Sequence, residues 1–294
     1  MNRQRSLTFG AINITLPPPH AAKTYLDLFM AAQQEGATVS LQGDWVGLIG
    51  LATPEDDPEA GLVIRGEFYK YVDLDAARDW YNVLSRKPAE PSELRRLSIP
   101  EELKPHFQFL PFVFFAKGHR LIAVTRDGKD AMSIRQMETV LNNAMNTEAI
   151  QAKFGRVEVT VEPSLETLDE ILTMPHLHRL ELEIKRPNPD DFEEFEQDFL
   201  DELEKQRASG IGMQISAQSG ETLRPSQRTT WLAQIAKSNG KVVGTGGLRG
   251  KTRTLSTAKH PFEQRESYMP WLETRSDAVL TKAKAIVGKF VRRP

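Results

Sequence analysis

The sequence predicts an α+β fold with mixed, mainly antiparallel sheets and helices packed on them. Hairpins occur together with β-α-β pieces along the chain, a mixture typical of this fold class. The 294 residues, of which 39% are hydrophobic, are enough to bury a sizeable core. We expect an N-terminal α+β region at 1–155 and a C-terminal α+β region at 156–294. The second region includes an acidic helix at 189–205 and a basic tail region at 224–294.

The N-terminal region opens with a β-α-β-β order. Its elements are a strand at 7–16, a helix at 20–35, a strand at 38–51, a polar turn at 53–58 and a strand at 62–72. The helix has an apolar stripe and ends at Gly36, because glycine readily adopts the left-handed conformation that follows a helix. Residues 84–105 are rich in Pro, Arg and Glu, which predicts an irregular connection.

A hairpin follows at 109–126, with its turn at 117–119. Its first strand, 109–116, is almost wholly apolar, and a strand without a polar face is typical of the centre of a sheet. We therefore expect a central strand here and an exposed His119 in the turn.

A second β-α-β unit and an acidic helix come next. The expected elements are a helix at 133–154, a strand at 157–161, a helix at 165–172 and a strand at 179–185. Asn188 and Pro189 mark the start of the acidic helix, because Asn caps helices and Pro fits the first helical position. The remaining elements are a strand at 213–217, a helix at 225–238, a glycine-rich ribbon at 241–257 and a final helix at 276–291.

Charge is segregated along the chain, although the formal net charge is only −2. Residues 207–294 contain 16 Lys and Arg against 5 Asp and Glu, a balance of +11, whereas residues 1–206 contain 22 against 35, a balance of −13. A segregated basic surface is typical of proteins that bind a polyanion, because each neutralised phosphate releases condensed counterions. We therefore expect a polyanion to bind the basic third and to avoid the acidic part.

The glycine-rich ribbon carries the leading candidate residues. Alternate side chains of a strand share a face, so Arg249, Lys251 and Arg253 line up, and the glycines at 244–250 let a backbone approach phosphates closely. These glycines match neither the Walker pattern nor G-x-G-x-x-G. The G-x-x-G of the KH fold fits 247–250 but needs a helix on each side. The alternative interpretation is a flexible, solvated hairpin.

The final helix adds further basic residues around a small apolar face, which favours docking on the core with the cations outside. The expected nucleic-acid-binding residues are Lys241, Arg249, Lys251, Arg253, Lys259, Lys282, Lys284, Lys289, Arg292 and Arg293. The acidic helix has one apolar and one carboxylate face, which indicates a solvated surface, with a DNA mimic or an autoinhibitory partner of the basic third as alternatives.

Composition and spacing argue against catalysis. The absence of cysteine excludes disulfides, Cys-ligated zinc, iron–sulfur clusters and thiol catalysis, and it fits a reducing cytoplasm. His176 and His178 fall in phase with the apolar face of the 179–185 strand, whereas the nearby glutamates fall on the other face, so a metal site does not close there. We expect a cytoplasmic, non-enzymatic protein with no catalytic residue, no metal, no other cofactor and no membrane span.

The hairpin at 109–126 resembles the apolar hairpin of RexA-like phage exclusion proteins and of KwaB-like defence proteins. The order that follows is also similar to that of the RexA-like family: a polar helix at 132–145, a strand ending in Glu-Pro at 157–163, a β-α-β unit at 164–186 and a lysine-rich helix at 276–293. The resemblance implies a bacterial or prophage-borne antiviral defence protein of the exclusion or abortive-infection type. It also implies binding to double-stranded DNA without strong sequence preference, and a homodimer or higher homo-oligomer.

Three hypotheses follow. The leading one is a non-enzymatic nucleic-acid-binding protein of phage defence, with DNA favoured over RNA and a possible partner protein from the same locus. The second is a protein-interaction module that docks its basic third on the acidic helix of another copy or on an acidic partner. The third is a metal-dependent nuclease that uses His176, His178 and nearby acids.

Overall fold

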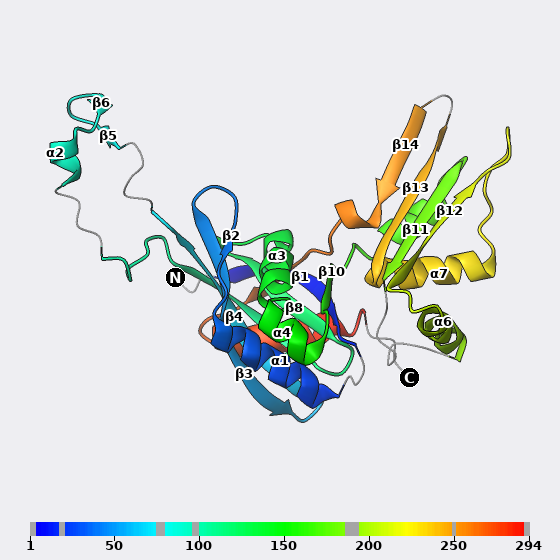
Figure 1. Cartoon of the computed structure of the whole chain (residues 1–294), viewed down its shortest axis with the longest axis horizontal. Coiled ribbons are helices and arrows are strands. Elements are labelled where there is room, and N and C mark those ends of the chain that lie inside the picture. The colour runs from blue at the N-terminus through cyan, green and yellow to red at the C-terminus, as the bar shows by residue number, and fades with distance from the viewer. Residues whose placement is uncertain are drawn as a thin grey trace.

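The structure is a computed structural model that describes residues 4–17, 21–74, 80–95, 100–185, 194–248 and 251–290. Figure 1 shows two sheets side by side, each with its own helices, and each sheet has its own hydrophobic core. Every strand pairing among the described residues is antiparallel. The expected α+β class with mainly antiparallel sheets is therefore confirmed.

The larger sheet and its helices form the large lobe. Its strands follow the order β10-β1-β8-β7-β4-β3-β2, with β15 also paired to β1 and β9 to β8. The strands are β1 (Arg5–Thr15), β2 (Val39–Ser40), β3 (Trp45–Asp57), β4 (Gly61–Val72), β7 (Gln108–Phe115), β8 (Arg120–Asp127), β9 (Asp130–Ala131), β10 (Glu158–Val161) and β15 (Gln264–Tyr268). The helices are α1 (Ala22–Glu35), α3 (Ile134–Ala144), α4 (Glu148–Phe154) and α8 (Arg275–Val287).

The smaller sheet and its helices form the small lobe, with strand order β12-β11-β13-β14. Its strands are β11 (Arg179–Lys185), β12 (Gly210–Ser216), β13 (Gly240–Leu248) and β14 (Lys251–Ser256), and its helices are α5 (Thr167–Leu172), α6 (Glu194–Lys205) and α7 (Gln227–Ser238). The short elements β5 (Tyr81–Asn82), β6 (Lys87–Pro88) and α2 (Pro91–Leu94) lie apart from both sheets, at the far left of Figure 1.

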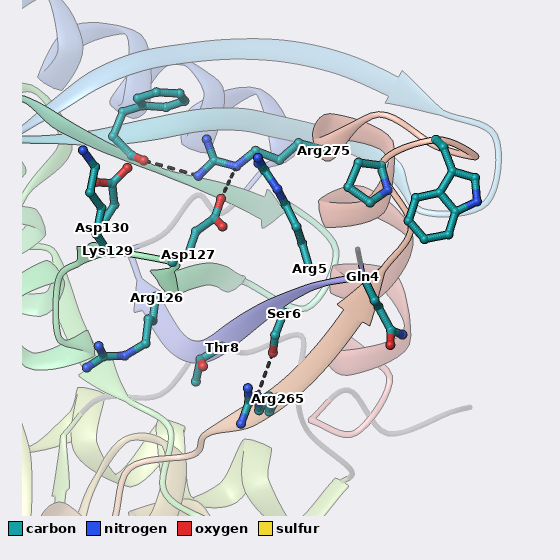
Figure 2. A pocket seen from close by; sticks show the side chains of 14 residues that line it. Gln4, Arg5, Ser6, Thr8, Arg126, Asp127, Lys129, Asp130, Arg265 and Arg275 are labelled. Atoms are coloured by element: carbon teal, nitrogen blue, oxygen red, sulfur yellow. Dashed lines mark hydrogen bonds and ion pairs between the residues drawn. The ribbon is translucent and has the colours of Figure 1, made fainter. Parts of the chain in front are cut away.

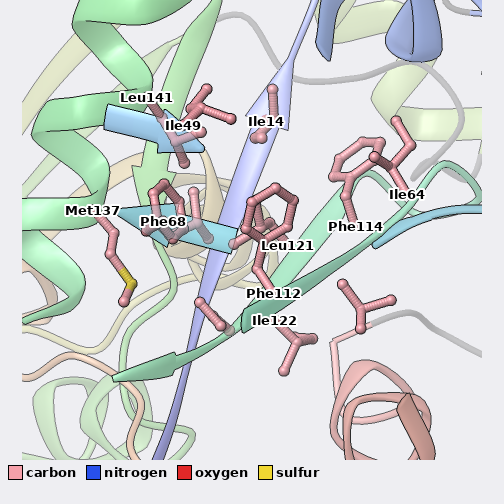
Figure 3. Packing of buried hydrophobic residues seen from close by; sticks show 14 of the residues in the cluster. Ile14, Ile49, Ile64, Phe68, Phe112, Phe114, Leu121, Ile122, Met137 and Leu141 are labelled. Carbon is pink, nitrogen blue, oxygen red and sulfur yellow. The ribbon is translucent and has the colours of Figure 1, made fainter. Parts of the chain in front are cut away.

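The core of the large lobe centres on β7 and β8, the expected apolar hairpin. Both strands are buried almost throughout, because α1 and α3 pack on the large sheet while α8 packs against β7 and β8. Phe112 and Phe114 pack at a tilt against Phe29 of α1, with ring centroids 5.9 and 4.9 Å apart. Figure 3 shows Phe112 and Phe114 among the buried side chains of this core. The predicted central strand is therefore confirmed. A strand that is covered on both faces carries apolar side chains on both of them.

Several local expectations change where tertiary contacts intervene. The polar stretch at 53–58 continues β3 as far as Asp57, because these residues pair with the start of β4. Pro54 is tolerated there, because no other described strand pairs with that end of β3. The expected helix at 133–154 is two helices, since Thr147 caps the start of α4. Gly36 ends α1 in the left-handed conformation, as predicted.

His119 is buried and not exposed, which corrects the expectation for the hairpin turn. Only 1% of its surface is accessible, and its ring lies 4.8 Å from the ring of Tyr25. The backbone carbonyl of His119 accepts a hydrogen bond from the amide of Ile14, so the turn folds back onto β1 beneath α1. A turn is exposed only when nothing packs over it, and sequence alone does not show this.

The boundary expected at residue 155 differs from the division between the two sheets. β10 and β15 both pair with β1, so the chain leaves the large lobe after β10 and returns to it at β15. The expected second β-α-β order is present as β10, α5 and β11, but its two strands lie in different sheets. The small lobe is thus an insertion between two strands that share the same edge of β1, and the basic tail region 224–294 is divided between the lobes.

A buried polar network joins the lobes where they meet. The guanidinium of Arg120 in β8 lies 2.7 Å from the carboxylate of Glu162 and donates to the side chain of Asn13 at 2.6 Å. Asn13 donates in turn to the side chain of Asn239 at the start of β13, and Ser238 of α7 donates to Glu162 at 2.9 Å. The small lobe therefore supplies hydrogen-bond partners to the buried carboxylate of Glu162 and to the buried Asn13 of the large lobe.

We expect Glu162→Ala to lower the free energy of unfolding by about 3 to 5 kcal/mol, because it leaves the Arg120 guanidinium buried without its counter-charge. Urea denaturation followed by circular dichroism measures this loss. The matched control is Arg156→Ala, which removes an ion pair whose guanidinium is 78% exposed and should cost at most about 1 kcal/mol. Equal losses in the two variants would show that the network does not stabilise the fold.

Candidate nucleic-acid interface

The glycine-rich ribbon forms the strand pair β13–β14 at the edge of the small sheet. Lys251 and Arg253 are exposed and share one face of β14, as expected, and Arg249 lies outside the described residues. The same face carries the buried Leu255, so the two cations lie beside the helices of this lobe. Arg253 approaches Glu170 of α5 to 3.8 Å, and part of its charge is thereby balanced.

Two glycines of the ribbon serve packing inside the small lobe. A Cβ at Gly244 would lie 2.5 Å from the side chain of Ile171, and one at Gly246 would lie 2.7 Å from the sulfur of Met174. The space above both glycines is therefore filled by α5 and the residues that follow it. Their lack of a side chain is explained by these contacts without any phosphate.

The next two expected residues, Lys241 and Lys259, are both exposed. The ammonium group of Lys241 in β13 lies 2.6 Å from the carboxylate of Glu183 in β11. This hydrogen bond to Glu183 raises the pKa of Lys241. Lys259 ends the short 3-10 turn η2 (Thr257–Lys259) that leads back to the large lobe.

The cations of α8 mostly face partners in their own chain. Lys284 lies 2.6 Å from Asp57 and 3.3 Å from Glu59, and Lys282 lies 3.7 Å from Glu266. The expected Arg292 and Arg293 lie outside the described residues. These contacts bind the final helix to the turn after β3 and to β15, which leaves fewer free charges than the sequence suggested.

Lys289, just after α8, donates to the side chain of Gln264 at 2.8 Å and lies 6.0 Å from the ring centroid of Phe262.

A second group of cations surrounds a cleft at one end of the large sheet, where β1, β8 and β15 meet the start of α8 (Figure 2). The cleft has a volume of about 1390 Å³. Its charged lining residues are Arg5, Arg126, Lys129, Arg265 and Arg275, against Asp127 and Asp130. Five cations against two carboxylates leave a local excess of three positive charges.

Strand register arranges part of this lining in a row. Thr8 of β1 is the pairing partner of Arg126 in β8 and also of Arg265 in β15. Paired residues of neighbouring antiparallel strands project from the same face, so the two arginines flank Thr8 across two strand spacings, roughly 10 Å. Arg265 also donates to the hydroxyl of Ser6 at 2.7 Å, which holds its guanidinium at the wall of the cleft.

The other wall is built around Arg275, the first residue of α8. Its guanidinium lies 2.8 Å from the carboxylate of Asp127 and 4.6 Å from the ring centroid of Phe109. Arg275 is therefore neutralised and held in place. By contrast, Arg5, Arg126 and Lys129 are exposed, and no ion pair joins them to any other residue that the structure describes.

The sequence patterns did not identify this cleft. Arg5, Arg126 and Lys129 belong to the segment whose net charge is −13, and Arg265 and Arg275 are separated from them by more than a hundred positions. The one local signal is the run Arg126-Asp127-Gly128-Lys129, a turn with cations at both ends.

The two histidines considered as metal ligands lie in the small lobe. The Nδ1 atom of His176 is 3.3 Å from the hydroxyl of Thr222, and His178 bonds through its backbone to β13 and to the residue after β12. In the described part of the chain, no group of three or more His, Asp or Glu side chains could hold a metal ion.

A family model described as a domain of unknown function, DUF4747, matches residues 5–284. The chain belongs to the DUF4747 family. The matched range includes both lobes and all five cations of the cleft, whereas Lys289, Arg292 and Arg293 lie beyond it. No curated protein matches the chain. Within the ranges described, no helix combines the length and the apolar character needed to cross a membrane.

We expect Gly246→Ala to lower the free energy of unfolding by about 1 to 3 kcal/mol, because its Cβ meets Met174 and the backbone carbonyl of His176 at 2.8 Å or less. Chemical denaturation tests this. Gly212→Ala in the neighbouring β12 is the control, since a Cβ there meets nothing within 4 Å, and it should be neutral or slightly stabilising. If the free energy of unfolding of Gly246→Ala equals that of wild type, packing does not explain this glycine.

The Lys284–Asp57 pair predicts a pH dependence of stability. The ammonium group of Lys284 lowers the pKa of Asp57, and the Asp57 carboxylate raises the pKa of Lys284. The stabilisation from Asp57 is present above the ordinary carboxyl pKa and is lost as pH falls through the lowered one. The stabilisation from Lys284 is present below the ordinary lysine pKa and is lost as pH rises through the raised one.

The stability difference between wild type and Lys284→Met should therefore be largest between about pH 5 and 9 and should shrink below about pH 4. Thermal unfolding across a pH series measures it. Lys117→Met, at an exposed lysine, is the control and should track wild type at every pH. A difference that stays constant down to acidic pH would contradict the pairing.

Proposed function

We propose that this protein binds nucleic acid without catalysing a reaction, and that the cations of the cleft contact the phosphates. The observation that carries the proposal is the excess of cations in one concave site, with Arg5, Arg126 and Lys129 exposed there. Concave sites lined by one sign of charge concentrate their counter-ions, and arginine and lysine account for most phosphate contacts.

Polar groups beside the cations support the same binding mode. Ser6 and Thr8 project from the face of β1 that carries Arg126 and Arg265, and hydroxyl groups are frequent donors to phosphate oxygens. Arg265 uses one nitrogen on Ser6, and a guanidinium has further donors for a ligand. The expected ribbon and terminal helix lack this convergence, since Lys241, Lys282 and Lys284 each face a carboxylate.

The proposal includes a role in bacterial phage defence, which the resemblance of the 109–126 hairpin to exclusion and defence proteins supports. The protein then recognises nucleic acid mainly by its backbone charge, without strong preference for a base sequence.

Two charge-matched triple variants test which surface binds. The cleft variant combines Arg126→Glu, Lys129→Glu and Arg265→Glu, and the ribbon variant combines Arg249→Glu, Lys251→Glu and Arg253→Glu. We expect the cleft variant to lose most of its affinity in a gel-shift assay at low salt. Its plot of log affinity against log salt should become shallower by about two to three units, because three phosphate contacts are lost. The ribbon variant should bind like wild type.

Both variants change the net charge by the same amount, so a general electrostatic effect would lower the nucleic-acid affinity of both equally. Loss of binding in the ribbon variant alone would assign the phosphates to β13–β14 and contradict the cleft. If wild type binds neither duplex nor single strand, the proposed function is wrong. Circular dichroism spectra matching wild type are required of both variants.

A further inference from the structure

The cleft also presents an aromatic ring. Trp271 lines it, in the loop between β15 and α8, and 43% of its surface is accessible. No ring stacking or cation contact joins its indole to another described residue, whereas the ring of Phe109, which also lines the cleft, is covered by the guanidinium of Arg275.

The loop that carries Trp271 is held at both ends. Tyr268 is buried and pairs with Arg5 of β1, and Arg275 is held by Asp127. Between these anchors the carbonyl of Met269 accepts hydrogen bonds from the amides of Leu272 and Glu273, which closes a turn around the tryptophan. The indole is thus only partly covered by the fold, and a large aromatic ring remains accessible on a secured loop of the cleft.

Cations next to an available aromatic face form the combination that binds unpaired nucleotides. The cations hold the backbone, and the ring stacks on a base, since every base has a flat face. In a duplex the faces of the bases are covered by their neighbours, so an indole at the wall of a cleft finds a base face only in a single strand or at a duplex end.

We propose that the cleft binds a single-stranded segment of nucleic acid, with one base stacked on Trp271 and the adjoining phosphates on Arg5, Arg126 and Arg265. This inference rests on the proposed function and adds the class of ligand. It differs from the double-stranded DNA that the resemblance of the hairpin implies. It also assigns Trp271, a residue outside both the ribbon and the basic positions of the terminal helix, as a specificity-determining contact.

An abasic strand separates stacking from charge, because it keeps the phosphates and lacks the bases. Fluorescence anisotropy compares labelled oligothymidylate with an abasic strand of the same length. We expect wild type to bind oligothymidylate about tenfold more tightly than the abasic strand, and Trp271→Ala to bind both with the lower affinity. Trp271→Phe should restore part of the difference, since phenylalanine offers a smaller ring.

The matched control is Leu272→Ala, in the same loop and 74% exposed, which should bind like wild type. Equal affinities of wild type for the two strands, with both weakened by the cleft variant, would overturn the stacking inference and leave the proposed function standing. A preference of wild type for duplex over single strands that Trp271→Ala does not change would also overturn the stacking inference and leave the proposed function intact. If wild type binds duplex but neither strand, the inference of a single-stranded ligand is overturned. If wild type binds neither strand nor duplex, or if the cleft variant binds nucleic acid normally, the proposed function itself fails.

Discussion

The buried hydrogen-bond network around the ion pair of Arg120 and Glu162 is the constraint on which the arrangement of the two lobes depends. Both side chains are almost completely buried, and a buried charge is tolerated only with its counter-charge and further hydrogen bonds in place. Asn13 and Ser238 supply these from different lobes. A displacement of the small lobe would remove the hydrogen bonds of Ser238 to Glu162 and of Asn13 to Asn239 and leave these buried polar groups without those partners, so the network favours one discrete arrangement over a hinge.

The same region determines where the chain returns to the large lobe. Next to Glu162, Pro163 forms a bridge with Pro261, and the amide of Phe262 donates to the carbonyl of Glu162, so the outgoing and returning segments lie side by side. This brings β15 onto β1 in the register that places Arg265 beside Thr8. The loop with Trp271 and the start of α8 follow directly. The cleft thus exists because the insertion of the small lobe begins and ends at the same edge of β1.

Sequence patterns were most informative where a local rule decides the structure. The apolar run at 109–116 indicated a central strand, and Gly36 marked a helix end, because burial on both faces and left-handed backbone each require particular residue types. The glycines of the ribbon were ambiguous, since a glycine creates room without showing what fills it. Beside Gly244 and Gly246 the space is filled by Ile171 and Met174. Charge was equally ambiguous, because Lys241, Lys282 and Lys284 meet carboxylates from other parts of the chain.

By itself, the sequence determined the α+β class, most of the elements and the abundance of cations in the last third of the chain. Only the tertiary structure decided which cations are neutralised and which converge, and it drew three of the five cleft cations from the acidic segment. The reason is physical: hydrophobic periodicity acts between neighbours in sequence, whereas an electrostatic site depends on distances of a few ångströms in space. Positions as far apart in sequence as Arg5 and Arg275 line one cleft only when strand pairing brings them together.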